Sequence, residues 1–204
     1  MDEIYIPTAI QGSVPGNFPQ VFRWKLSDSP AWVTKIQILG IILFFVSGIP
    51  LMVLALWTGT SSGSFSIDLR ELGTCLAAFA SWPVILILHE LAHGLTMTVF
   101  GARPQYGAQL KKLLFYATAP GYAFQRNAYL IVTLAPLVLL SIPMILGTFI
   151  LRGTTWAMLI AFCAAFNIGG AAGDLAITRM VLGYSKNTYI VDEKDGFRAL
   201  IRGE

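Results

Sequence analysis

Four long apolar stretches constrain this 204-residue chain more than any other feature. They cover about residues 38–57, 72–100, 128–151 and 155–182, and short polar segments separate them. A helix rises about 1.5 Å per residue, so about 20 apolar residues cross the hydrocarbon core of a bilayer. Each stretch reaches that length. We therefore expect an all-α membrane protein with about four transmembrane helices.

The composition agrees with a bilayer protein. Hydrophobic residues make up 55% of the chain and charged residues 12%, whereas charged residues make up about 25% of a typical soluble domain. The net charge of +3 is too small to indicate a nucleic-acid partner. Cys75 and Cys163 both lie inside apolar stretches, which favours packing over a disulfide. The expected partner is the lipid bilayer.

The basic residues are distributed unevenly about the four stretches. Of the 14 lysines and arginines, only Arg70 and Arg152 fall on one side of the membrane. The other 12 (14 less 2) lie before the first stretch, between the second and third, or at the carboxyl end. Because basic residues are retained on the cytoplasmic side, both termini are expected in the cytoplasm. The whole chain, 1–204, then forms one membrane-embedded domain with tails at 1–35 and 183–204.

Two acidic residues, Glu90 and Asp174, fall at membrane depth, where an ionisable group calls for a partner and a purpose. The only two histidines of the chain, His89 and His93, flank Glu90 in an HExxH pattern. Residues i and i+4 share a helix face, so both imidazoles can bind one Zn²⁺ while the glutamate accepts a proton from a bound water. The plainer alternative is a pair of core histidines satisfied by hydrogen bonds.

A catalytic zinc usually takes three protein ligands, and Asp174 is the candidate for the third. In one continuous helix Asn167, Gly170 and Asp174 share a face, and the small residues among them let another helix approach. The second and fourth stretches run in parallel, with His89 about 17 and Asp174 about 19 residues into theirs, so their depths agree within about one turn. The alternative is a packing seam with Asp174 at the cytoplasmic interface.

This HExxH motif, followed by a later span with Asn and Asp, resembles the site-2 protease type of intramembrane zinc metalloprotease. The run from His89 to Gly94, then Phe100-Gly101 and a short polar loop, is also similar to the putative zincin peptidases, which are small bacterial membrane proteins. The resemblance covers roughly residues 80–180. It implies a bacterial plasma-membrane location.

The resemblance also implies a set of residue roles. His89, His93 and Asp174 would be the metal ligands, Glu90 the general base, and Asn167 a helper near the metal or the substrate. Where the site-2 pattern has a proline after the asparagine and a glycine after the aspartate, this chain has Gly170 and Leu175.

The segment 104–120 joins the second and third stretches. Alternating apolar residues on either side of two lysines predict an amphipathic β-hairpin at the cytoplasmic interface. Its edge can pair with an extended peptide substrate, and Tyr106, Gly107 and Leu110 are the candidate contacts. The alternative is a loop that only connects helices. Near the carboxyl end, a short strand at 189–191 is expected before a solvated turn at 192–195.

Three functions remain open from the sequence. The leading hypothesis is an intramembrane zinc metallopeptidase that cleaves a peptide or membrane-protein substrate near the cytoplasmic face. A zinc-containing membrane protein that only binds partners would keep the ligands but would not need Glu90. A proton-coupled carrier would relay protons through His89, Glu90 and Asp174, although four spans are few for transport.

Overall fold

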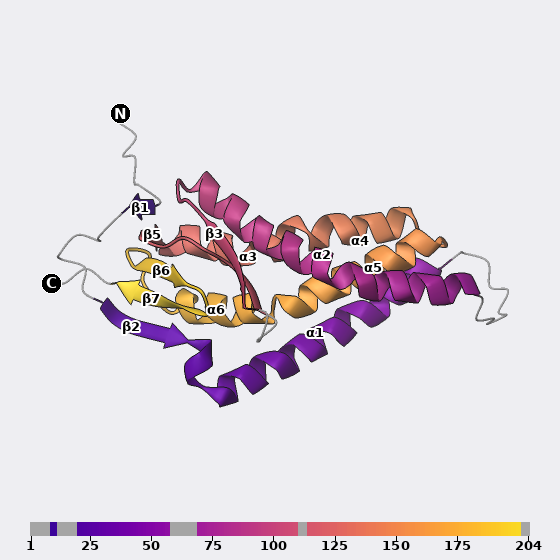
Figure 1. Cartoon of the computed structure of the whole chain (residues 1–204), viewed down its shortest axis with the longest axis horizontal. Helices are drawn as coiled ribbons and strands as arrows, with labels where there is room; N and C mark the ends of the chain where they lie inside the picture. The colour runs from indigo at the N-terminus through magenta and orange to yellow at the C-terminus, as the bar shows by residue number, and fades with distance from the viewer. Residues whose placement is uncertain (1–8, 12–19, 58–68, 110–113, 201–204) are drawn as a thin grey trace. The chain divides into compact units, whose positions relative to one another are not determined.

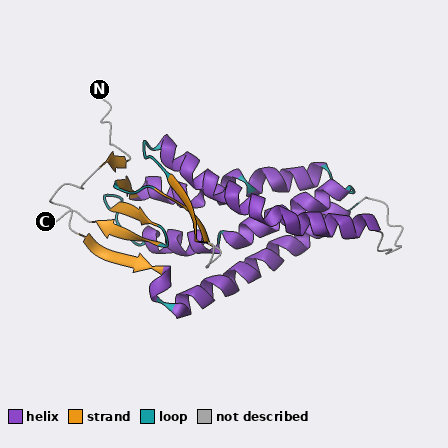
Figure 2. Cartoon of the chain, viewed as in Figure 1, coloured by secondary structure: helices purple, strands orange, loops and turns teal. Residues whose placement is uncertain are grey.

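The computed structural model describes residues 9–11, 20–57, 69–109 and 114–200. Most of them are helical (Figures 1 and 2). The six helices are α1 (Pro30–Leu56), α2 (Leu69–Val99), α3 (Arg126–Leu139), α4 (Ser141–Ile150), α5 (Thr155–Gly170) and α6 (Ala172–Leu182).

Three helical stretches are long and apolar enough to cross a membrane: Pro30–Leu56, Leu76–Val99 and Arg126–Ile150. A fourth span results if α5 and α6, which are bent by 41° at a short break, count as one. The prediction of about four transmembrane helices is confirmed to this extent. The third and fourth spans are each made of two helices.

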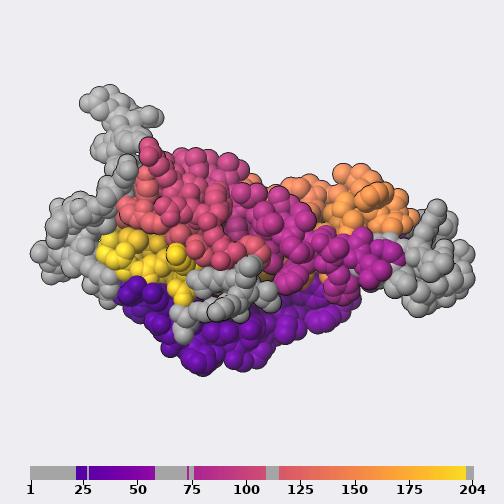
Figure 3. All heavy atoms as spheres, viewed as in Figure 1, coloured from indigo at the N-terminus to yellow at the C-terminus, as the bar shows by residue number. Residues whose placement is uncertain are grey.

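Helix α1 shows most directly what surrounds the protein. Its most apolar window has a mean hydropathy of 2.6, yet only 11% of that window is buried inside the protein. Water would penalise such a surface, whereas lipid tails would not. This apolar surface belongs to the indigo part of Figure 3. Its exposed side chains are Ile38, Ile41, Ile42, Phe45, Val46, Ile49 and Val53.

The chain divides into two compact units, and the first of these comprises residues 1–34, 90–135 and 174–204. It contains a two-stranded sheet of β3 (Gln105–Gln109) and β4 (Leu114–Thr118). The hairpin predicted for the segment 104–120 is therefore present. Its register pairs Tyr106 with Ala117 and Ala108 with Phe115.

The first unit also contains a five-stranded antiparallel sheet that the all-α prediction did not include. Its strand order is β1-β5-β6-β7-β2, with bounds β1 Ala9–Gln11, β5 Tyr122–Gln125, β6 Tyr189–Glu193, β7 Gly196–Leu200 and β2 Gln20–Lys25. In β5 and β7 consecutive residues are buried, so the strands lack the alternation that marks a half-exposed sheet.

The core of the first unit joins this sheet to α3. Phe124, Ile190 and Phe197 from three strands are fully buried, and they cluster with Tyr129 and Val132 of α3. Arg126, the first residue of α3, donates its backbone N–H to the Thr188 carbonyl at 2.9 Å. The sheet therefore holds the amino-terminal part of α3 in place.

The second unit comprises residues 35–89 and 136–173. Helices α4 and α5 pack together, and small residues of α5 form a core with α1. Gly40 and Gly169 meet so closely that a Cβ on Gly40 would lie 3.0 Å from the Gly169 carbonyl oxygen. Cys163 is buried as a free thiol beside the Ser81 hydroxyl, at 3.2 Å. The side chain of Cys75 lies outside the described part.

Candidate metal centre

The HExxH motif lies within α2, in the carboxyl-terminal half of a continuous helix. His89 and His93 are both buried, each with 8% of its surface exposed, and Glu90 is half-buried. Both histidines are one helical turn apart, so their rings lie on one face of α2. The predicted helical arrangement of the motif is therefore present.

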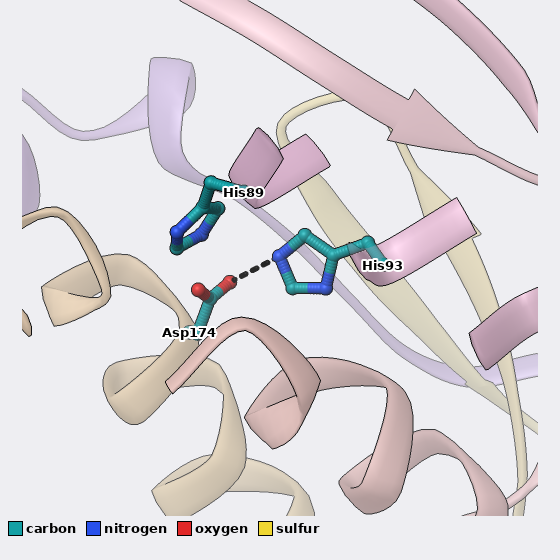
Figure 4. Close-up of side chains that lie close together, drawn as sticks. All are labelled: His89, His93 and Asp174. Carbon is teal, nitrogen blue, oxygen red and sulfur yellow. Dashed lines mark ion pairs between the residues drawn. The ribbon is translucent and has the colours of Figure 1, made fainter. Parts of the chain in front are cut away.

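Asp174 joins the two histidines at one place (Figure 4). Each of the three side chains offers one ligand atom, and these atoms all lie within 4.8 Å of one another. The Nε2 atom of His93 lies 3.4 Å from Oδ1 of Asp174. Two ligands at about 2.1 Å from a tetrahedral zinc ion are about 3.4 Å apart. The donor set and this spacing both fit Zn²⁺.

The hydrogen bond at Nδ1 of His93 shows which ring nitrogen carries a hydrogen. Its Nδ1 lies 2.8 Å from the backbone carbonyl oxygen of Val132 in α3. A carbonyl oxygen can only accept, so Nδ1 carries the hydrogen and donates it. Nε2, which faces Asp174 as an ion pair in the metal-free protein, is then the nitrogen that can offer a lone pair to a metal. A hydrogen bond from the ring nitrogen that does not face the metal is what orients metal-binding histidines.

His89 is held by a side chain instead of a carbonyl. Its Nδ1 lies 3.0 Å from Oδ1 of Asn167, which is 1% exposed in the interior of α5. The asparagine singled out in the sequence therefore contacts a predicted metal ligand. The contact holds the orientation of the His89 ring.

Asp174 lies in the first turn of α6, just after the short break that separates α5 from α6. The backbone N–H of Ala171 closes α5 by donating to the Asn167 and Gly169 carbonyls. The prediction placed Asn167, Gly170 and Asp174 on one face of an unbroken helix, and this is wrong because the helix bends by 41°. The bend occurs in the run of glycines and alanines at residues 169–173, because glycine has a low helix propensity.

Glu90 contacts the β-hairpin. Its Oε2 accepts a hydrogen bond of 2.6 Å from the backbone N–H of Ala117 in β4. That N–H therefore points away from β3, and in an antiparallel ladder the carbonyl of the same residue points the same way. Within the described residues β4 pairs only with β3. Glu90 thus lies against the other edge of β4.

The three hairpin residues predicted to contact a substrate differ in their surroundings. Tyr106 lies over Gly94, the residue that follows His93, and a Cβ on Gly94 would overlap the tyrosine hydroxyl. Gly107 is covered by the ring of Tyr116 in the same way. Leu110 lies outside the described residues.

Sequence reasoning missed Asp192, which was expected in a solvated turn. It lies instead on β6, where Oδ1 accepts a hydrogen bond of 2.8 Å from the fully buried Tyr129. Burial raises the pKa of Asp192 to about 7, although contacts with Tyr129 and Thr118 and the proximity of His93 oppose the rise. A strand shorter than six residues beside a charged turn gives no periodicity that could have identified this position.

The model of one protein family, described as putative zincin peptidase, matches residues 83–189. The chain belongs to this family. The match spans the HExxH motif on α2, the hairpin, α3 to α6 and the start of β6, so it includes all three candidate ligands. Neither the curated proteins nor the solved structures contain a significant match to this chain.

Proposed function

We propose that this protein is an intramembrane zinc metallopeptidase that hydrolyses peptide bonds at or near the cytoplasmic membrane face. The observation that carries the proposal is the grouping of His89, His93 and Asp174 within 4.8 Å, with Glu90 next to the first of them in a chain of the zincin peptidase family. Three protein ligands leave a coordination position for water, as a catalytic zinc site requires.

The residues of the chain have separate tasks in the reaction. Zn²⁺, when bound, polarises the attacking water and the scissile carbonyl. Glu90 accepts the proton of that water and passes it to the leaving amine, so that one peptide bond and one water become a carboxylic acid and an amine. His89 and His93 present Nε2 because their Nδ1 atoms are engaged by Asn167 and Val132.

The hairpin supports a substrate in extended form. The edge of β4 that carries the Ala117 N–H runs past Glu90, and an extended peptide can add to such an edge as a further strand. An extended chain also exposes the peptide bond that a helix conceals. Tyr106 and Gly107 of β3 shape the same hairpin. We therefore propose that the enzyme takes an unwound peptide segment, and that both termini of the enzyme lie in the cytoplasm.

The test is Glu90→Gln in detergent-purified protein, with a quenched-fluorescent peptide library as the probe. Hydrolysis is expected to fall by at least about 100-fold, because general-base catalysis contributes that much, while the zinc content stays the same. Glu193→Gln is the matched control, since it makes the same change at an ion pair with Arg23 and Arg198. Unchanged hydrolysis in the Glu90 variant would refute the mechanism.

A further inference from the structure

A single proline in α3 is close to the hydrogen bonds that hold both candidate histidine ligands. Pro136 lies inside α3, where a residue of any other kind would donate its backbone N–H to the carbonyl four positions earlier. That carbonyl belongs to Val132, and it is the one that accepts the hydrogen bond of 2.8 Å from His93 Nδ1. Because the proline lacks this N–H, His93 does not share the Val132 carbonyl with a helix donor at position 136.

The carbonyl of the same proline affects His89 through Asn167. Asn167 donates through Nδ2 to the Pro136 carbonyl oxygen at 3.0 Å and to the Ser141 hydroxyl at 2.8 Å. Because a carbonyl oxygen cannot donate, the amide group must face it with its nitrogen. Oδ1 of Asn167 then faces His89, whose Nδ1 lies 3.0 Å away. An acceptor at this place requires a hydrogen on Nδ1, so Nε2 is the nitrogen that can offer a lone pair to a metal.

The helix irregularity that follows Pro136 completes the arrangement. Helix α3 ends at Leu139 and α4 begins at Ser141, so the Ser141 hydroxyl stands at the junction, where it is 3% exposed. The Pro136 carbonyl still accepts the backbone N–H of Leu140 at 3.1 Å, and its second lone pair is available to Asn167. Both hydrogens of the asparagine amide are thereby used.

We infer that Pro136, together with Ser141, is a positioning residue that sets the tautomer and orientation of both histidine ligands. It removes a helix donor that would share the Val132 carbonyl with His93, and its own carbonyl orients Asn167 toward His89. This inference rests on the proposed function for its purpose, but the hydrogen-bond network can be tested without any peptidase assay.

The first test is Pro136→Ala, which restores an N–H that competes for the Val132 carbonyl. Zinc affinity, measured by competition with a chelating indicator, is expected to fall about tenfold, the scale seen when groups hydrogen-bonded to metal ligands are lost. Thermal stability should stay the same or rise, because a proline has left a helix interior. Pro50→Ala is the matched control, since Pro50 lies inside α1 and should leave zinc affinity unchanged.

A rescue distinguishes the missing N–H from a change of helix shape. The α-hydroxy analogue of alanine at position 136 also lacks the N–H, so it should restore the affinity that Pro136→Ala loses. Ser141→Ala affects only the asparagine branch and should lower zinc affinity several-fold, while Ser141→Thr keeps the hydroxyl. Thr148→Val is its control, because that buried hydroxyl donates only to the Met144 carbonyl.

The imidazole ¹⁵N spectrum of the metal-free wild type needs no variant. The chain has two histidines, and both are expected to carry a hydrogen on Nδ1. An Nδ1 without a hydrogen on either ring, or a zinc affinity in Pro136→Ala equal to that of Pro50→Ala, would overturn the inference. Failure of the wild type to bind zinc would instead refute the proposed function, and the spectrum of the metal-free protein would still show whether both Nδ1 atoms carry a hydrogen.

Discussion

Asp192 provides a prediction whose size can be worked out from its surroundings. Its carboxyl group accepts a hydrogen bond from buried Tyr129, and its Oδ2 atom is enclosed by protein. Burial raises the pKa from 3.8 to about 7 in the folded protein. Between these two values the folded state binds more protons than the unfolded state. The free energy of unfolding must therefore fall as the pH rises through this window.

The magnitude follows from the shift of about three pKa units. At 1.36 kcal/mol per unit the full effect is about 4 kcal/mol, of which about 3 kcal/mol falls between about pH 4.5 and about pH 7.5. Asp192→Asn removes the ionisation but keeps an oxygen that accepts from Tyr129. The variant should therefore lose about 3 kcal/mol less stability than the wild type over that interval, which corresponds to about 6–12 °C in melting temperature.

The assay is thermal unfolding of metal-free protein in detergent at a series of pH values, with Asp195→Asn as the control. Asp195 lies in the turn between β6 and β7, so its substitution makes the same chemical change three residues away without touching the hydrogen bond of Tyr129. Parallel melting curves for the wild type and Asp192→Asn across the interval would refute the claim that burial holds a proton on this carboxyl group.

Two further substitutions test the metal centre and the hairpin. Asp174→Ala removes one of three ligands, so zinc affinity should fall more than about 100-fold, beyond the range for outer-shell partners; retained stoichiometric zinc under chelator competition would exclude Asp174 as a ligand. Gly94→Ala places a Cβ 2.7 Å from Cε1 of Tyr106 and must displace the ring, while the helix gains about 1 kcal/mol in propensity. Hydrolysis should fall without loss of thermal stability, and the effect should vanish in a Tyr106→Ala background; equal activity of Gly94→Ala and wild type would show that the contact has no role.

The features that the sequence could predict are those carried by local patterns. The apolar stretches predict the helices because each crosses a bilayer by itself, and the spacing of His89 and His93 predicts a shared helix face. Asp174 was identifiable because an acid at membrane depth is rare. The hairpin at 105–118 was identifiable from two short alternating runs about a polar turn.

The features that the sequence could not predict depend on contacts between distant segments. The five-stranded sheet joins residue 9 to residue 200, and its strands of three to six residues are too short for a clear periodicity. The burial of Asp192 depends on this sheet, so the sequence could not predict it either. The break at Ala171 was obscured because glycine and alanine runs fit a close-packed helix as well as a bend.

The polar groups around the candidate ligands come largely from interruptions in the helices. A regular helix in a bilayer satisfies all its backbone groups internally and leaves nothing with which to orient an imidazole. Pro136 leaves the Val132 carbonyl to His93, and the junction at Ser141 supplies partners for Asn167. In the fourth span, Asp174 follows the break at Ala171. At the candidate site, interruptions in the helices therefore supply polar groups that an unbroken helix would keep in its own hydrogen bonds.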